Sequence, residues 1–434
     1  MNKLSQVLRR HPLLNMLSEL EGNPRICVLT EPLWGIPYNL YSPYVGLYMA
    51  ALGLSDYRIG LVAAAGTFFQ MFGALFGGVI TDKLGRRRTT FLFDIISWSI
   101  PALIWMCAQN FWWFFAAIIF NSMWQVTDNA WSCLLVEDCD QKKLVDVYTW
   151  VSVSGLLAVF FAPLSGFLVN TFSLVPAVRI LYFVTFVMMS TKFIILYTCC
   201  TETEQGKKRL KETRHTSMLG MLSGYQAVFK KLVKNPATIV VLSLKILLSV
   251  SQMVNTNFFG LYITRGLNIP TAMVALFPMV RAVVMLIFIF TVQHIINRMK
   301  FRPIMLAGGI LYFLANILLL LTTQKSLWML LIYLLMDAFS WALLIPRQDS
   351  LMVVFVDEAE RARTLGLIFV ITLAFTAPFG VIVGKLSETN MRFPFVLNAV
   401  LFLLLVLLVF YSPALKDYDR KNENSLAQPV PDSE

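Results

Sequence analysis

The chain has 434 residues, of which 57% are hydrophobic and only 14% are charged, whereas about a quarter of an average soluble domain is charged. A single core surrounded by water could not bury so many apolar side chains, and the apolar residues form runs that are long enough to cross about 30 Å of hydrocarbon as helices. The formal charge of +11 does not indicate a nucleic-acid partner, because the basic residues lie mainly in alternate loops between these runs. We therefore expect an all-α integral membrane protein in a lipid bilayer, with no nucleic acid as partner.

Residues 1–25 contain no apolar segment of signal-peptide length, and we interpret them as a cytoplasmic N-terminal segment. Twelve transmembrane helices are predicted, near 26–50, 57–80, 88–108, 111–135, 146–169, 176–199, 237–262, 272–297, 303–323, 326–350, 364–386 and 394–412. Prolines are expected to bend four of them: Pro32, Pro37 and Pro43 in the first, and Pro101, Pro163 and Pro378 in the third, fifth and eleventh.

The polar segment 201–236 contains the basic run KKRLKETRH and divides the predicted helices into two sets of six. We interpret it as a cytoplasmic linker between an N-terminal six-helix bundle, 26–200, and a C-terminal six-helix bundle, 237–412. Residues 413–434 are predicted to be a cytoplasmic tail, disordered from Lys416 onward because of its polar and charged composition.

The distribution of Lys and Arg predicts the orientation, since loops that stay in the cytoplasm carry an excess of both. With both termini in the cytoplasm, the basic clusters at 83–88, 142–143 and 298–302 all lie on that side. We expect a multi-pass, monomeric protein of the cell membrane whose N- and C-termini are cytoplasmic.

The two halves of the sequence resemble each other, as expected of a transporter built from repeats. Glu137 and Asp138 after the fourth helix match Asp357 and Glu358, 220 residues further on. Ala162-Pro163 in the fifth helix matches Ala377-Pro378 in the eleventh. The matches favour two related bundles.

The loop between the second and third helices reads GGVITDKLGRRR. It resembles the loop motif Gly-x-x-x-Asp-(Arg/Lys)-x-Gly-Arg-(Arg/Lys) of the major facilitator superfamily, and every position is filled, by Gly78, Asp82, Lys83, Gly85, Arg86 and Arg87. The resemblance implies that family's fold over residues 26–412.

The physical properties of the motif agree with the resemblance. Gly78 has no side chain, so we expect another helix to approach closely there, and Gly85 permits a tight turn. The resemblance implies a cytoplasmic conformational latch formed by Asp82, Arg86 and Arg87, with Glu137 or Asp138 as a partner. Alternatively, the basic residues only set the topology.

Ionisable residues inside a membrane helix are costly and therefore indicate a cavity or a charged partner. Helical spacing places Glu31, Trp34, Tyr38 and Tyr41 on one face of the first helix and Asn121, Gln125 and Asp128 on one face of the fourth. In the C-terminal half, Lys245, Gln252 and Asn255 lie along the seventh helix, Arg281 lies in the eighth, and Asp337 and Trp341 lie in the tenth. The first, fourth, seventh and tenth helices line the central cavity of the family, so the resemblance implies that their stripes form the substrate site.

Other interpretations of these residues remain open. The tyrosines could belong to an aromatic belt at the membrane surface. Asp128 with Arg347, or Asp337 with Arg281, could form static ion pairs. Lys192 is expected to extend from the membrane toward the lipid headgroups.

The sequence contains no Gly-x-x-x-x-Gly-Lys-Ser/Thr segment, so we do not expect ATP to drive transport. Its three scattered histidines favour neither a metal site nor an enzyme, and no cofactor is expected. Together with the resemblance, these observations predict a secondary active transporter of a small organic solute that works by alternating access, with protons as the coupling ion and Glu31 or Asp128 as the carboxylate that binds them.

Aromatic and amide side chains favour a sugar or another polar solute. The acidic residues equally suit a lipophilic cation, as in a multidrug efflux protein that exchanges drugs for protons. A third alternative is a membrane sensor that has the transporter fold and transports nothing.

Overall fold

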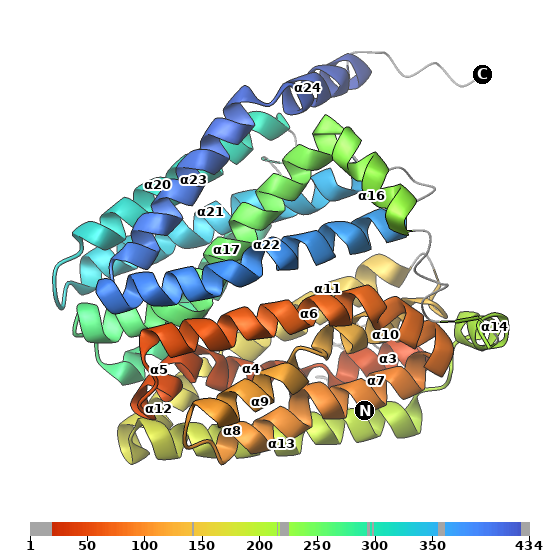
Figure 1. The fold of residues 1–434 in the computed structure, drawn as a ribbon, viewed down its shortest axis with the longest axis horizontal. Coiled ribbons are helices and arrows are strands. Elements are labelled where there is room, and N and C mark those ends of the chain that lie inside the picture. Colours follow the sequence, from red (N-terminus) through yellow and green to blue (C-terminus); the bar gives the residue numbers. More distant parts are fainter. Residues whose placement is uncertain are drawn as a thin grey trace, which may run out of the picture. The chain divides into compact units, whose positions relative to one another are not determined.

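The computed structural model describes residues 20–140, 143–214, 216–217, 225–292, 296, 299–354 and 361–426. Every regular element among these residues is a helix, so the predicted all-α fold is confirmed (Figure 1). Asp357 and Glu358, the counterparts of Glu137 and Asp138 in the second half, lie outside the described residues.

Two compact units divide the chain. The N-terminal unit comprises residues 1–223 and Pro270–Met279, and the C-terminal unit comprises residues 224–269 and the chain from Val280 onward.

The N-terminal unit begins with short helices and continues with longer ones. Its helices are α3 (Gly22–Thr30), α4 (Pro32–Tyr41), a 3₁₀ turn (Ser42–Tyr44), α5 (Val45–Ala51), α6 (Asp56–Leu84), α7 (Arg86–Asp94), a π-helical turn (Ile95–Ser99), α8 (Ile100–Met106), α9 (Phe111–Asn121), α10 (Trp124–Val136), α11 (Leu144–Val159), α12 (Ala162–Phe172), α13 (Leu174–Cys199) and α14 (Glu204–Glu212). The 3₁₀ turn Thr271–Ala275 also belongs to this unit.

The remaining helices are mostly long. They are α16 (Tyr225–Lys234), α17 (Pro236–Leu261) with a π-helical turn (Tyr262–Gly266), α18 (Leu276–Thr291), α20 (Phe301–Leu321), α21 (Leu327–Val354), α22 (Arg361–Thr389), α23 (Phe393–Tyr411) and α24 (Pro413–Leu426). The helix α24 shows that our prediction of disorder from Lys416 was wrong for the first part of the tail.

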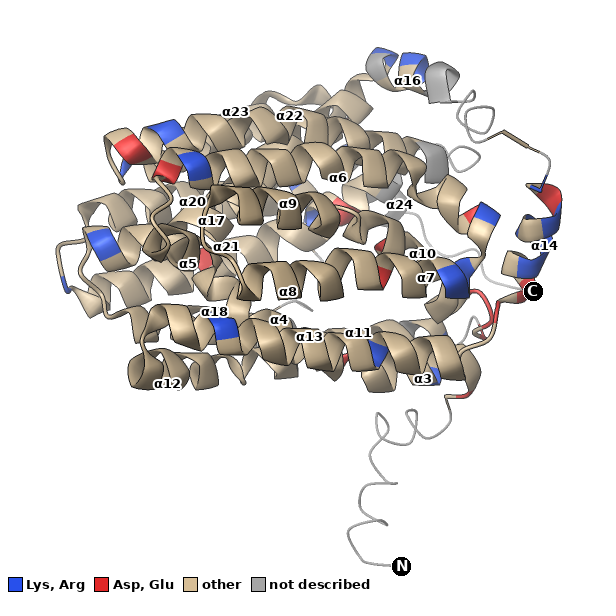
Figure 2. Ribbon diagram, turned by 60° about the horizontal axis from the view of Figure 1, so that its bottom comes forward, with Lys and Arg blue, Asp and Glu red and all other residues tan. Residues whose placement is uncertain are grey.

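Among the described residues, ten helical segments are long and apolar enough to cross a membrane, and they correspond to ten of the twelve predicted spans. Figure 2 shows that the middle of most helices carries few charged residues, while Lys and Arg gather on α14, on α16 and at helix ends. This distribution is the one that a bilayer requires, because a charge is costly in hydrocarbon and stable near the headgroups.

The other two predicted spans are interrupted helices. The first breaks at Glu31, just before Pro32, and again at the 3₁₀ turn that contains Pro43, because proline cannot donate a helical hydrogen bond. The fourth breaks at Ser122–Met123, between α9 and α10. By contrast, α22 continues through Pro378.

Helix α6 packs closely against α10 and the residues just before it at Gly73 and Gly77. A Cβ added to Gly73 or Gly77 would lie 3.3 Å from the backbone of Ser122 or Val126, whereas one added to Gly78 would meet only the Asn129 amide at an ordinary 3.5 Å. The close approach that we expected at Gly78 therefore belongs to Gly73 and Gly77.

Candidate functional site

The motif loop turns tightly at Gly85 between α6 and α7. Gly85 has a φ of +85°, a conformation that favours glycine, in agreement with the predicted turn. The turn places Asp82 at the end of α6 and Arg86 at the start of α7, four residues apart, with Lys83 beside Asp82. The tight turn thus brings the acidic and basic residues of the motif together.

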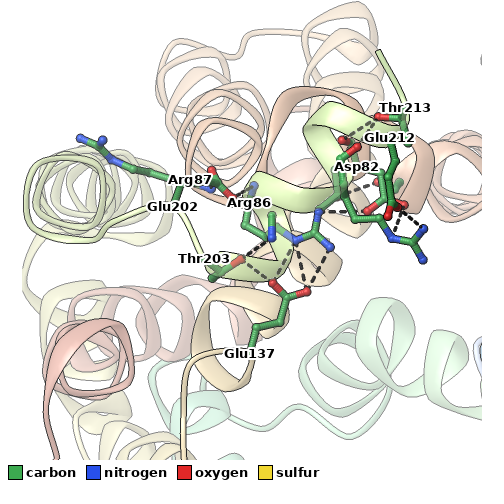
Figure 3. A network of polar contacts seen from close by, with 12 residues as sticks. Asp82, Arg86, Arg87, Glu137, Glu202, Thr203, Glu212 and Thr213 are labelled. Carbon is green, nitrogen blue, oxygen red and sulfur yellow. Dashed lines mark hydrogen bonds and ion pairs between the residues drawn. The ribbon is translucent and has the colours of Figure 1, made fainter. Parts of the chain in front are cut away.

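Arg86 is the centre of a polar network (Figure 3). Its Nη1 lies 2.9 Å from Asp82 Oδ1, and its Nη2 and Nε lie 3.0 Å from the two Glu137 carboxylate oxygens. The Arg86 side chain is only 5% exposed. A guanidinium group is planar and can donate hydrogen bonds to two carboxylates at once. Arg86 therefore joins the end of α6, at Asp82, to the end of α10, at Glu137. The sequence-predicted Asp82, Arg86 and Glu137 are therefore in direct contact.

The start of the linker folds against this network, which the sequence did not reveal. Glu202 accepts hydrogen bonds from the backbone N–H groups of Arg86, at 2.8 Å, and Arg87, at 3.2 Å. Thr203 Oγ1 donates to Glu137 Oε2 at 2.5 Å, and Thr213 Oγ1 donates to the Asp82 carbonyl at 3.1 Å. Glu202 thus caps the N-terminus of α7, where Gly85 has no side chain to do so.

Arg87 connects α7 to the sixth predicted span. Its Nε donates to the Tyr197 carbonyl at 2.7 Å, Nη2 donates to the same oxygen, and the guanidinium lies 4.6 Å from the centre of the Tyr197 ring. The arginine that sequence analysis assigned to topology or to a latch therefore also holds α13 against α7.

The C-terminal unit repeats this arrangement on different residues. Asp419 on α24 accepts hydrogen bonds from the backbone N–H groups of Phe301 and Arg302 at the start of α20, at 2.8 and 3.1 Å. Arg302 Nε donates to the Val409 carbonyl at 3.2 Å, and its guanidinium lies 5.2 Å from the Phe410 ring. The pair Arg302 and Asp419 therefore corresponds to Arg87 and Glu202, which supports the internal repeat.

We expect Glu202→Ala to lower the free energy of unfolding by about 1–2 kcal/mol, because two N-terminal amides of α7 lose their charged acceptor. The matched control is Glu204→Ala, since the Glu204 side chain is 82% exposed and forms its ion pair with Lys207 on its own helix. SDS-induced unfolding of the purified protein, followed by tryptophan fluorescence, measures both. Equal unfolding curves for the two variants would contradict the capping role.

A cavity of about 180 Å³ lies within the N-terminal unit. It is lined by residues from the start of α4, from α7 and the π-helical turn after it, and from α10, α11 and α13: Glu31, Trp34, Asp94, Trp98, Trp124, Thr127, Asp128, Trp131, Val151, Lys192 and Phe193. Three sequence-predicted site residues, Glu31, Trp34 and Asp128, therefore share one cavity.

Glu31 and Lys192 form a buried ion pair in this cavity. Lys192 Nζ lies 2.7 Å from Glu31 Oε2, and the two side chains are 6% and 12% exposed. The ammonium also lies 5.3 Å from the centre of the Trp131 ring. Our prediction that Lys192 extends to the headgroups was wrong, because Glu31 stabilises its charge inside the protein.

Asp94 and Asp128 are the other two carboxylates of the cavity. Asp94 is buried, and its Oδ1 accepts a hydrogen bond from Thr127 Oγ1 at 2.7 Å. Asp128 is exposed. Sequence analysis did not include Asp94 in the site, although its position in the third span was the available signal.

The remaining predicted residues of this unit lie beside the cavity. Tyr38 stacks on Trp34 with ring centres 4.9 Å apart, and Tyr41 meets Tyr38 edge to face at 5.7 Å. The Asn121 amide donates to the Ser97 carbonyl at 2.8 Å, and Gln125 packs against Gly73. Asn121 and Gln125 are not among the lining residues. The break between α9 and α10 separates Asn121 from Asp128, whereas Gln125 lies on the same helix as Asp128 but packs against α6.

A second cluster lies in the C-terminal unit, around Asp337. Arg281 Nε lies 3.5 Å from Asp337 Oδ2, and the Trp341 indole N–H donates to Asp337 Oδ1 at 3.1 Å. The Arg281 guanidinium lies 5.3 Å from the centre of the Trp341 ring. This finding agrees with the ion-pair alternative for Arg281 and Asp337.

The polar residues of α17 have separate neighbours. Asn255 donates to the Tyr312 hydroxyl at 2.5 Å, and Lys245 Nζ donates to Gln348 Oε1 at 3.4 Å. Gln252 is exposed. Thus Lys245, Gln252 and Asn255 have no common partner among the contacts that the described residues make.

Within the described residues, no group of three or more His, Cys, Asp or Glu side chains is arranged to hold a metal ion. The polar chemistry of the N-terminal unit is instead that of ion pairs, indole rings and hydroxyl groups around a small cavity.

The ten long apolar helices among the described residues are those of a multi-pass membrane protein. The structure is similar to that of a mutant of the nucleoside transporter NupG, with a TM-score of 0.72 and 14% identity over 90% of this chain and 99% of that one. It is also similar to a POT family transporter in complex with a thioalcohol-conjugated peptide, with a TM-score of 0.71 and 15% identity over 90% of this chain and 96% of that one.

The Major Facilitator Superfamily model matches residues 34–371 and, in a second match, 242–431. The chain therefore belongs to this family, as the loop motif indicated. A curated relative, the uncharacterized MFS-type transporter YqjV of Bacillus subtilis (strain 168), is 27% identical over 130 residues. That alignment spans 30% of this chain and 32% of the relative.

Proposed function

We propose that the protein is a secondary active transporter that moves a small organic solute across the cell membrane by alternating access, with protons as the coupling ion. The observation that carries this proposal is the cavity of the N-terminal unit, where Glu31, Asp94 and Asp128 lie with a single lysine. Charged groups inside membrane helices are retained for pathways of ions and substrates. Carboxylates in such a place can bind protons from one side and release them to the other.

In this proposal the predicted bundles, 26–200 and 237–412, rock against each other around the linker 201–236, as in other transporters built from repeats. The network of Asp82, Arg86 and Glu137 acts as the latch, with both chain termini in the cytoplasm and the monomer as the working unit. The hydrogen bonds that Glu202 and Thr203 of the linker make with this network support a direct mechanical connection between the linker and the latch.

Uptake of labelled solutes into liposomes that contain the purified protein tests proton coupling. A panel of labelled glucose, tetraphenylphosphonium and lysophosphatidylcholine identifies a transported probe. With that probe, we expect a proton gradient to accelerate transport by the unmodified protein several-fold, and we expect no acceleration for Glu31→Gln, which keeps the shape of the side chain but cannot ionise.

Glu388→Gln is the matched control, because Glu388 is exposed near the end of α22. It should retain the full response to the gradient. Equal transport rates with and without the gradient in the unmodified protein would exclude proton coupling. Failure to transport any member of the panel would instead favour the sensor alternative.

A further inference from the structure

The cavity of the N-terminal unit contains more acidic than basic groups. Glu31, Asp94 and Asp128 share the cavity with one lysine, so three carboxyl groups stand against a single ammonium. Glu31 and Lys192 already neutralise each other at 2.7 Å. Asp94 has the Thr127 hydroxyl, which carries no charge, and Asp128 is exposed. Lys192 also interacts electrostatically with Asp94, so Asp128 is the carboxylate that no cation among the lining residues compensates.

The walls of the cavity are unusually aromatic. Four of the lining residues are tryptophans, Trp34, Trp98, Trp124 and Trp131. The face of an indole ring attracts a cation more strongly than that of any other side chain, and aromatic enclosures bind quaternary ammonium groups. The negative charge and the indole faces thus favour the same kind of ligand.

The protein's own lysine shows that an ammonium is stable here. Lys192 Nζ lies 5.3 Å from the Trp131 ring centre and 6.0 Å from that of Trp34, within the range of cation–π attraction. A ligand ammonium between Asp128 and the tryptophans would meet the same combination of carboxylate and ring.

We infer that the cavity binds a small organic cation, an ammonium compound, with Asp128 as its charged anchor. The cavity of about 180 Å³ is smaller than the ~300–1,000 Å³ of sites for drug-sized ligands, which favours a compact ligand. The sugar that we expected from the sequence is disfavoured, because an uncharged solute would leave Asp128 without a counterion.

This inference deepens the proposed function, because it names the class of solute that the transporter would carry. Its test is binding to the purified full-length protein in detergent, measured by calorimetry, so it does not depend on transport. The probes are choline, its uncharged isostere 3,3-dimethylbutan-1-ol, and glucose. We expect choline to bind at least about tenfold more tightly than either uncharged probe, since carboxylate and indole contacts act only on the cation.

Variants connect the binding to the cavity. Asp128→Asn should weaken choline binding by about tenfold or more and leave 3,3-dimethylbutan-1-ol unaffected, whereas Asp128→Glu should retain most of it because the charge remains. The control Asp417→Asn removes an exposed carboxylate on α24 and should change nothing.

Choline binding no tighter than that of its isostere, tighter binding of glucose, or equal choline binding by Asp128→Asn and Asp417→Asn would each overturn the inference. These outcomes differ from failure of the proposed function. A protein that binds choline as expected but transports no solute in liposomes would refute transport and leave the ligand class intact.

Discussion

Lys192→Met is expected to lower the free energy of unfolding by about 3–5 kcal/mol, the usual cost of removing one partner of a buried ion pair. The Lys192 and Glu31 side chains are 6% and 12% exposed, so water cannot replace the lost ammonium. Asp94 and Asp128 line the same cavity and make the remaining charge of Glu31 more costly. SDS-induced unfolding of the purified protein, followed by tryptophan fluorescence, measures the loss.

The double variant Glu31→Gln/Lys192→Met separates the ion pair from simple packing. It should recover much of the lost stability, because the uncompensated carboxylate is also removed. The control Lys207→Met removes a lysine whose side chain is 54% exposed and should behave like the unmodified protein. A Lys192→Met variant as stable as this control would contradict our account of the pair.

Arg86→Ala is expected to lower the free energy of unfolding by about 2–4 kcal/mol, because Asp82 and Glu137 lose the guanidinium that joins them. Those carboxylates are 23% and 15% exposed, so water compensates in part. Arg86→Lys should recover less than half of the loss, since an ammonium cannot bond both carboxylates with planar geometry. The same unfolding titration measures both variants.

The chain offers a matched control two residues away. Arg88 lies on the same helix, is exposed, and follows the same motif. Arg88→Ala should leave stability unchanged. Equal destabilisation by Arg88→Ala and Arg86→Ala would contradict a specific role of Arg86 in the network. It would favour the alternative interpretation, in which the basic residues of the loop only set the membrane topology.

Local patterns in the sequence were sufficient to predict most of the fold. Apolar runs predicted the ten long apolar helices. A segment that crosses the hydrocarbon must satisfy its backbone hydrogen bonds internally, so a long apolar run indicates a helix. Proline marked the breaks of the first span, as at Pro32 and Pro43. The loop motif identified the family. Its spacing placed Asp82 four residues from Arg86, on the other side of the turn at Gly85.

Contacts between distant segments could not be predicted in the same way. The sequence placed Lys192 in the sixth span but showed neither its depth nor its partner, 161 residues away. Glu202 gave no signal as the cap of α7, because an acidic residue at the start of a charged linker is usually solvated. Asp94 and Asp128 lie on different helices, and only their packing around the cavity unites them.

The matching caps of the two units have a practical consequence for anyone who modifies this chain. Glu202 and Asp419 lie beyond the last long apolar helix of their halves, in segments that a designer would regard as dispensable. Shortening the C-terminus to Tyr411, or inserting a reporter protein directly after Cys199, would remove or displace an anchor of the third helix in that half. A purification tag placed beyond Leu426, where α24 ends, preserves the anchor at Asp419.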